Sequence, residues 1–185
     1  NSAVVSYITS TAATKAECDI CCTSSNALKV VNSLEEDEII FVPDKNLGAF
    51  VAAQVPSKKF YFHENGFCKI HDKLSADKVA ECKAKHPDAL ILVHPECNKA
   101  VCDMADYLGS TSQLIDYCEK SDAKEFIICT EQGVTKRMIA LMPNKAFYVP
   151  DAKQLYCDSM KAITKEMLLS TLENETGEVF VDESL

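Results

Sequence analysis

The sequence predicts an α/β protein made of two tandem, pseudo-symmetric layered units with mostly parallel sheets. One observation is that short, β-rich apolar runs, AVVSYI at 3–8 and ALILVH at 89–94, are each followed by a helix-forming stretch. Strands that alternate with helices are typical of parallel sheets, because each helix returns the chain to the start of the next strand. The other observation is that the same succession of elements occurs twice.

An offset of 87 residues aligns the two occurrences. Tyr7 and His94 end corresponding strands, and 94 − 7 = 87. The same offset pairs Ala13 with Ala100, Asp19 with Asp106, Ser25 with Ser112, Glu38 with Glu125, Ile40 with Ile127, Ala53 with Ala140, Pro56 with Pro143, and Lys58 with Lys145. Agreement in order and in strand phase indicates an internal duplication.

After a two-residue insertion the repeat continues at an offset of 89. Cys68 then meets Cys157, and Ser75 meets Thr164. Ser and Thr are preferred N-cap residues, and an acid follows each of these two by two positions, which predicts a helix at the same place in both units. Each unit is expected to run strand, helix, short strand, helix, strand, helix, strand.

The repeat also sets the expected domain boundaries. The first α/β unit is expected at 4–88 and the second at 89–177. At the offset of 89, EVFVDE at 178–183 falls on ALILVH. Residues 178–185 are therefore expected to be the strand that starts a third unit, absent from this chain.

Composition and charge exclude several classes of function. A formal net charge of −9 argues against a nucleic-acid surface, which needs clustered Lys and Arg, although a small anion could still bind locally. The sequence has no apolar run near the roughly 18 residues of a membrane span, and its start has no basic region or long apolar core of a signal peptide. We therefore expect a cytoplasmic protein.

The 10 cysteines are the compositional anomaly. Without a secretion signal they are expected to be reduced, and most of them to be small buried hydrophobic residues. Cys18 and Cys21 form a C-x-x-C with Cys22 adjacent, but a second close pair, which would strongly indicate zinc, does not follow. Structural zinc at Cys18, Cys21 and Cys22 is kept as an alternative.

Polar residues recur where the predicted strands end, and ligands of open α/β sheets bind at such ends beside helix N-termini. The recurring groups are Tyr7-Ile8-Thr9 with His94-Pro95-Glu96, TSSN at 23–26 with STSQ at 110–113, in which Ser24 faces Thr111, and the single thiols Cys68 and Cys157. Each group alone is adequately explained as a cap, a solvated strand end or a buried thiol. Their coincidence in both units favours a shared ligand site.

One thiolate from each unit suits iron–sulfur chemistry. Two thiolates are too few for a full cluster, but a third unit could supply the third. Three ligands on four irons leave one iron open to act as a Lewis acid.

Several stretches resemble the quinolinate synthase A family: SYITSTAATKAECDICCTSSNA, FVPDKNLGAFVA, GFCKIHDKL, LVHPECNKAVCDMADYLGSTSQLI, CDSMKAIT and VFVDESL. The resemblance covers essentially all 185 residues. It implies three pseudo-symmetric α/β domains around a [4Fe-4S] cluster held by one cysteine from each. It also implies condensation of iminoaspartate with dihydroxyacetone phosphate to quinolinate, in NAD biosynthesis, and a functional link to L-aspartate oxidase or aspartate dehydrogenase.

The resemblance also assigns residues. The cluster ligands would be Cys68 and Cys157, with the third cysteine in a missing amino-terminal domain. The substrate-binding residues would be Tyr7, Thr9, Ser24, His71, His94, Glu96 and Thr111. Thr9 departs from the asparagine that the family has at this position. Cys97 is not a family ligand position and is expected to be incidental.

Glu96, His94 and Tyr7 would be the catalytic residues that the resemblance implies. Glu96 suits proton transfer, because a carboxylate in a closed pocket can have a raised pKa. His94 and Tyr7 could hydrogen-bond substrate oxygens, and the helix starts at Ser24 and Thr111 suit phosphate or carboxylate groups.

Without the missing domain, the chain is expected to fold but to be inactive and to hold no intact cluster. The alternative from another class is a non-catalytic module that binds a dicarboxylate or phosphate without a cluster.

Overall fold

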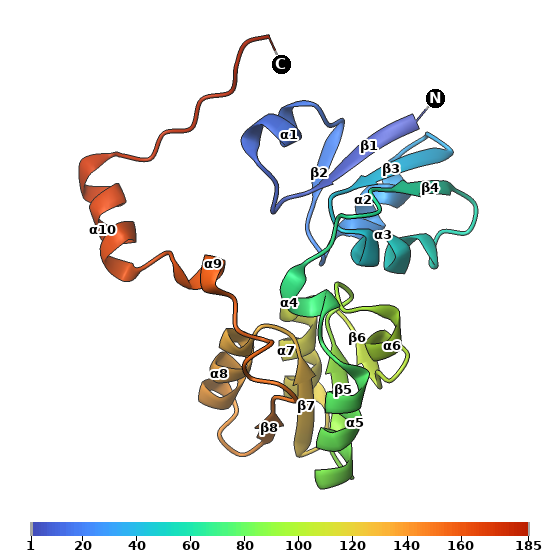
Figure 1. The fold of residues 1–185 in the computed structure, drawn as a ribbon, viewed down its shortest axis with the longest axis vertical. Helices are drawn as coiled ribbons and strands as arrows, with labels where there is room; N and C mark the ends of the chain where they lie inside the picture. Colours follow the sequence, from blue (N-terminus) through green and yellow to red (C-terminus); the bar gives the residue numbers. More distant parts are fainter. Residues whose placement is uncertain (1, 185) are drawn as a thin grey trace.

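The computed structural model describes residues 2–184 and contains two four-stranded parallel sheets (Figure 1). The first has the order β2-β1-β3-β4 and consists of β1 (Ser2–Tyr7), β2 (Ile20–Cys22), β3 (Glu38–Val42) and β4 (Lys59–Phe62). The second has the order β6-β5-β7-β8 and consists of β5 (Leu90–Val93), β6 (Tyr107–Leu108), β7 (Glu125–Cys129) and β8 (Ala146–Tyr148). The predicted α/β class with parallel sheets is confirmed.

Helices connect the strands and follow the last strand of each sheet. In the first half they are α1 (Ala12–Ala16), α2 (Ala27–Ser33), α3 (Lys45–Ala52), α4 (Lys69–Asp72) and α5 (Ala76–Lys85). In the second half they are α6 (Lys99–Cys102), α7 (Thr111–Lys120), α8 (Gln132–Leu141), α9 (Asp158–Lys161) and α10 (Lys165–Asn174). The side chains of the predicted caps Ser75 and Thr164 accept backbone N–H groups at the starts of α5 and α10.

The strand register reproduces the offset of the sequence repeat. Val4 of β1 is paired with Ile40 of β3, and Ile91 of β5 is paired with Ile127 of β7. Both 91 − 4 and 127 − 40 equal 87. The same pairs of residues therefore lie side by side in both sheets.

The second sheet is covered on both faces. Ile91 and Ile127 pack with Val79 of α5 on one face, and Leu92 and Phe126 lie in a separate apolar cluster on the other. Complete burial of one such side chain contributes about 1.5–3 kcal/mol. The helix α5 belongs to the first sequence repeat, yet it packs against the second sheet.

The first sheet has one well-covered face. Phe41 and Leu47 are fully buried there, whereas Val4, Ile40 and Val42 on the opposite face are only partly buried. The helix that matches α5 is α10, which starts 89 residues later (165 − 76 = 89) and buries none of its residues. Figure 1 shows α10 standing away from both sheets.

The two halves meet at α4, which lies between the sheets (Figure 1). The side-chain amide of Asn46 donates to Asp72 Oδ1 at 2.8 Å and to the carbonyl oxygen of Glu96 at 3.0 Å. Asn98 donates to the carbonyl oxygens of Asp72 and Leu74 at 2.7 and 2.8 Å. These bonds fix α4 to the turn after β5.

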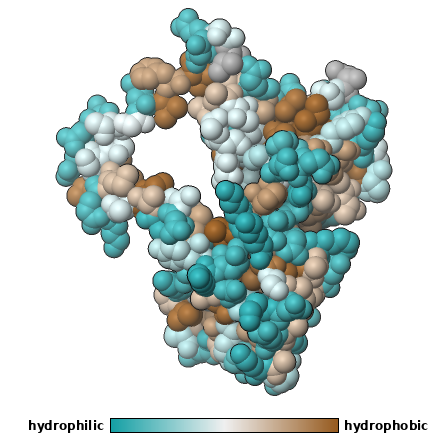
Figure 2. Space-filling view, in the orientation of Figure 1, coloured by the Kyte–Doolittle hydropathy of each residue, from teal (hydrophilic) through white to brown (hydrophobic). Residues whose placement is uncertain are grey.

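The strand expected at 178–185 does not form over 178–184, the part of this segment that the structure describes. A strand needs a hydrogen-bonded neighbour, and this tail is paired with neither sheet. Figure 2 shows the carboxyl-terminal part projecting from the body of the molecule, and Phe180 is 80% exposed. Across residues 2–184, every helix is too short or too polar to cross a bilayer.

Candidate active site

Six of the residues expected in a site surround the junction of the two halves. Tyr7 is the last residue of β1, and His94 and Glu96 follow β5. Cys68 directly precedes α4, and His71 lies within it. The hydroxyl of Tyr7 lies beside the side chains of Glu96 and Ser24. Because the carboxyl ends of parallel strands meet at one edge of their sheet, the ends of β1, β2 and β5 together with one short helix can supply all of these groups.

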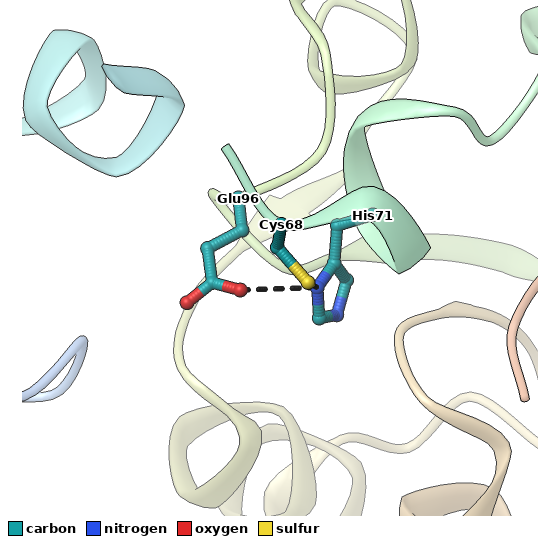
Figure 3. A group of neighbouring side chains, drawn as sticks. All are labelled: Cys68, His71 and Glu96. Atoms are coloured by element: carbon teal, nitrogen blue, oxygen red, sulfur yellow. Dashed lines mark hydrogen bonds and ion pairs between the residues drawn. The ribbon is translucent and has the colours of Figure 1, made fainter. Parts of the chain in front are cut away.

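Cys68, His71 and Glu96 converge on one point (Figure 3), and their ligand atoms lie within 4.8 Å of one another. His71 Nδ1 is 3.0 Å from Glu96 Oε2 and 3.2 Å from Cys68 Sγ. The other ring nitrogen of His71, Nε2, is 2.9 Å from Thr130 Oγ1. Glu96 is 5% exposed, and its second oxygen, Oε1, finds no hydrogen-bond partner among residues 2–184.

The histidine neighbours reverse the expected pKa shift of Glu96. Burial alone would raise the pKa, but the hydrogen bond from His71 and the electrostatic effects of His94 and His71 outweigh burial and lower the pKa to about 2. The expectation of a raised pKa is therefore wrong. A carboxylate has a raised pKa in an apolar pocket, whereas this carboxylate is paired with a buried imidazole.

The two histidines of the site differ in charge. Burial lowers the pKa of His71, but its contacts with Cys68 and Glu96 raise it overall to about 9. Burial and the neighbouring His71 lower the pKa of His94 to about 4, and the two rings stack with their centres 4.8 Å apart. His94 Nδ1 accepts the backbone N–H of Glu96 at 3.3 Å. Neutral His94 therefore carries its proton on Nε2 and can donate it to a ligand.

Burial raises the pKa of the Tyr7 phenol well above its usual range, and the neighbouring Glu96 carboxylate raises it further. Tyr7 is consequently a hydrogen-bond donor at neutral pH. The site thus combines a buried carboxylate, two imidazoles of different charge, a phenol and a thiol. This combination can bind an anionic ligand and move protons.

The whole chain, residues 1–185, matches the family model described as quinolinate synthetase A protein. The chain belongs to the quinolinate synthase A family. It is 47% identical over 185 residues to the quinolinate synthase of Clostridioides difficile, in an alignment that covers 100% of this chain and 60% of that relative. For the Geobacter metallireducens quinolinate synthase the identity is 50% over 182 residues, which cover 98% of this chain and 59% of the relative.

The quinolinate synthase of Clostridium acetobutylicum is 45% identical over 186 aligned residues, covering 100% of this chain and 60% of that relative. The chain therefore spans about 60% of the length of these curated relatives.

The remaining family positions, Thr9, Thr111 and Cys157, make no hydrogen bond to Cys68, His71 or Glu96 within residues 2–184. Thr9 is exposed just beyond β1, and Thr111 is the first residue of α7, partly buried behind the capping box of Ser110 and Gln113. Cys157 directly precedes α9, as Cys68 precedes α4. In the part of the chain that the structure describes, Cys157 lies outside the Cys68–His71–Glu96 group, and Cys18, Cys21 and Cys22 form no such group.

Asp44 is a site residue that the sequence analysis missed. It caps α3 through Oδ1, and its Oδ2 accepts the backbone N–H of Cys68 at 2.8 Å. Burial raises its pKa to about 6, with Glu96 adding to the rise, although the N–H of Leu47 opposes it. The repeat held a signal: Glu131, 87 residues later, caps α8 and pairs with Lys161 of α9 at 2.8 Å. An acid at the third strand end holds the small helix after the cysteine in both halves.

Replacing Cys97 by serine should leave the iron content and turnover expected of the full-length protein nearly unchanged. Cys97 is 1% exposed, lies in the apolar core of the second half, and donates its thiol to the carbonyl oxygen of Cys129 at 3.4 Å. Serine is similar in size and can make the same bond. Iron and sulfide analysis with a steady-state assay would check this, and loss of iron would make Cys97 a ligand.

Proposed function

We propose that the full-length protein is a quinolinate synthase that condenses iminoaspartate with dihydroxyacetone phosphate to form quinolinate for NAD biosynthesis. The observation that carries the proposal is the family match over the whole chain. The convergence of Tyr7, His94 and Glu96 at one buried place supports it. The nitrogen substrate would come from an L-aspartate oxidase or an aspartate dehydrogenase.

The proposed catalytic residues are Glu96, His94 and Tyr7, and the further substrate-binding residues are Thr9, Ser24, His71 and Thr111. Neutral His94 would donate from Nε2 to a carboxylate or carbonyl oxygen of the substrate, and the Tyr7 phenol would donate likewise from the facing half. Glu96 is ionised beside His71, so it would accept a proton from the substrate carbon or nitrogen and return it to a departing hydroxyl, as a weaker base than a raised pKa would have made it. Thr111, at the start of the ten-residue helix α7, would bind phosphate or carboxylate oxygens.

The chain offers two matching thiols to a [4Fe-4S] cluster. Cys68 and Cys157 are partly buried, each precedes a four-residue helix after the last strand of its sheet, and an acidic side chain anchors that region in both halves. When bound, a cluster with one open iron would supply a Lewis acid for substrate oxygens. We propose that the third thiolate lies outside these 185 residues and that this chain alone is inactive.

The packing of α5 supports a three-domain, pseudo-threefold architecture with repeats at 4–88 and 89–177. In the second sheet, Ile127 is fully buried beneath α5. Its counterpart in the first sheet, Ile40, is only partly buried. The counterpart of α5 is α10, which has no buried residues: Leu168 is 56% exposed, whereas the matching Val79 is fully buried. A third unit would bury α10, cover Ile40 with its own last helix, and give residues 178–185 a neighbouring strand.

Anaerobic reconstitution with iron and sulfide tests the proposal. The full-length protein should hold about four irons and form quinolinate from its two substrates, whereas its Cys68→Ser and Cys157→Ser variants should lose the intact cluster. The 185-residue chain should retain no intact cluster after desalting. Four stable irons on the short chain would contradict the three-thiolate assignment. Dicarboxylate binding without quinolinate formation by the full-length protein would favour a binding module instead.

A further inference from the structure

We propose that Cys68, His71 and Glu96 form a binding site for a single divalent transition-metal ion, with Zn²⁺ as the best match, when no cluster is present. The site uses one cluster thiol and two side chains that the cluster does not require. A lone Zn²⁺ and the cluster would therefore compete for Cys68 and exclude each other.

The spacing of the donor atoms fits one tetrahedral ion. Zn²⁺ binds sulfur at about 2.3 Å and nitrogen or oxygen at about 2.0–2.2 Å, which places neighbouring ligand atoms about 3.3–3.7 Å apart. His71 Nδ1 already lies 3.0 Å from Glu96 Oε2 and 3.2 Å from Cys68 Sγ. All three ligand atoms lie within 4.8 Å of one another, so small side-chain rotations would complete the geometry.

The surroundings hold the three ligands in place. Thr130 Oγ1 lies 2.9 Å from His71 Nε2, where it can accept that N–H and leave Nδ1 free to bind metal. Asp44 Oδ2 fixes the backbone of Cys68 through its N–H at 2.8 Å. Asn46 holds the carbonyl of Glu96 at 3.0 Å. Each ligand therefore has an orienting partner, as ligands in protein metal sites commonly have.

The buried carboxylate points independently to a ligand. Glu96 is 5% exposed, yet Oε1 makes no hydrogen bond within residues 2–184, although the Tyr7 hydroxyl lies beside this side chain. Leaving a buried acceptor unpaired is costly, and a metal ion or its bound water would satisfy it. Metal binding would release the protons of His71 Nδ1 and of the Cys68 thiol to solvent. One thiolate, one carboxylate and one neutral imidazole then balance the two charges of the ion, so the occupied site is neutral.

The mixture of donors decides which metal fits. A thiolate and an imidazole favour Zn²⁺, Co²⁺ or Fe²⁺ over Mg²⁺ and Ca²⁺, which take oxygen ligands. Three protein ligands leave the fourth tetrahedral position open to water. In a protein that has lost its cluster, bound zinc would thus block reassembly of the cluster until the zinc is removed.

Anaerobic titration of the metal-free 185-residue chain with Co²⁺ tests the proposal, because Co²⁺ reports thiolate ligation by charge-transfer absorbance and tetrahedral geometry by intense visible bands. We expect one Co²⁺ per chain, displaced by Zn²⁺. Cys68→Ser, His71→Ala and Glu96→Gln should each weaken binding by at least about tenfold. Circular dichroism would confirm that each variant is folded.

Matched variants separate this site from the cluster. Cys157→Ser should leave Co²⁺ binding unchanged but remove the intact cluster from the full-length protein. Glu96→Gln should do the reverse: it should weaken Co²⁺ binding and leave the cluster in place. Cys21→Ser, at a partly buried thiol outside the site, controls for adventitious binding. An unchanged Co²⁺ spectrum in Cys68→Ser, or equal losses in Cys157→Ser, would overturn the mononuclear site without touching the proposed enzyme activity.

Discussion

Replacing Glu96 by glutamine in the full-length protein should lower quinolinate formation by about a hundredfold or more, the usual scale for loss of a general acid or base. The amide has the shape of the carboxylate but cannot accept a proton. Glu96 is buried beside Tyr7 and 3.0 Å from His71, so bulk water cannot easily take over its role. The iron content should stay at the wild-type level, because Glu96 lies outside the proposed set of cluster ligands.

A matched substitution, Glu81→Gln, controls for the loss of one carboxylate. Glu81 lies on α5, is about half exposed, and within residues 2–184 pairs only with Lys78, at 2.8 Å. We expect wild-type turnover and iron in this variant, since an exposed ion pair contributes little. If Glu96→Gln also turns over within a few-fold of wild type, Glu96 has no part in proton transfer, and His94 or Tyr7 must carry it.

The two sheets could be predicted from the sequence, because the patterns that specify strands and helices are local. The alternation of apolar strands and capped helices predicts two parallel sheets, and the 87-residue offset returns as the register of Val4 with Ile40 and of Ile91 with Ile127. The packing of α5 on the second sheet could not be predicted. The apolar face of a helix shows that the helix is buried, but it does not specify which sheet the helix packs against.

Strand ends could be predicted from the sequence, whereas contacts between elements far apart in the chain could not. Tyr7, His94 and Glu96 lie at or just after strand ends, as expected, and their part in a site stays a prediction. Asp44 was missed because its bond to Cys68 spans 24 residues. The direction of the Glu96 pKa shift was wrong for the same reason: the partner that decides it, His71, comes from another element.

Truncating Ile127 to alanine should destabilise the 185-residue chain far more than truncating Ile40 in the same way. Ile127 is fully buried between its sheet and α5, and removing such a side chain costs about 2–5 kcal/mol. Ile40 occupies the same place in the first sheet but is only partly buried, so its loss should cost about 1 kcal/mol. Urea unfolding of both variants measures the difference in the free energy of unfolding, provided that the two variants have the same m-value.

The same pair of variants in the full-length protein tests the third unit. If a helix of that unit covers Ile40 as α5 covers Ile127, the cost of Ile40→Ala should rise to about 2–5 kcal/mol, while the cost of Ile127→Ala should stay the same. The two substitutions delete identical atoms, so the chemistry is controlled and the difference reports only what covers each position. A cost for Ile40→Ala that is equal in the short and full-length chains would mean that this face stays open to water, and the pseudo-threefold architecture would have to be abandoned.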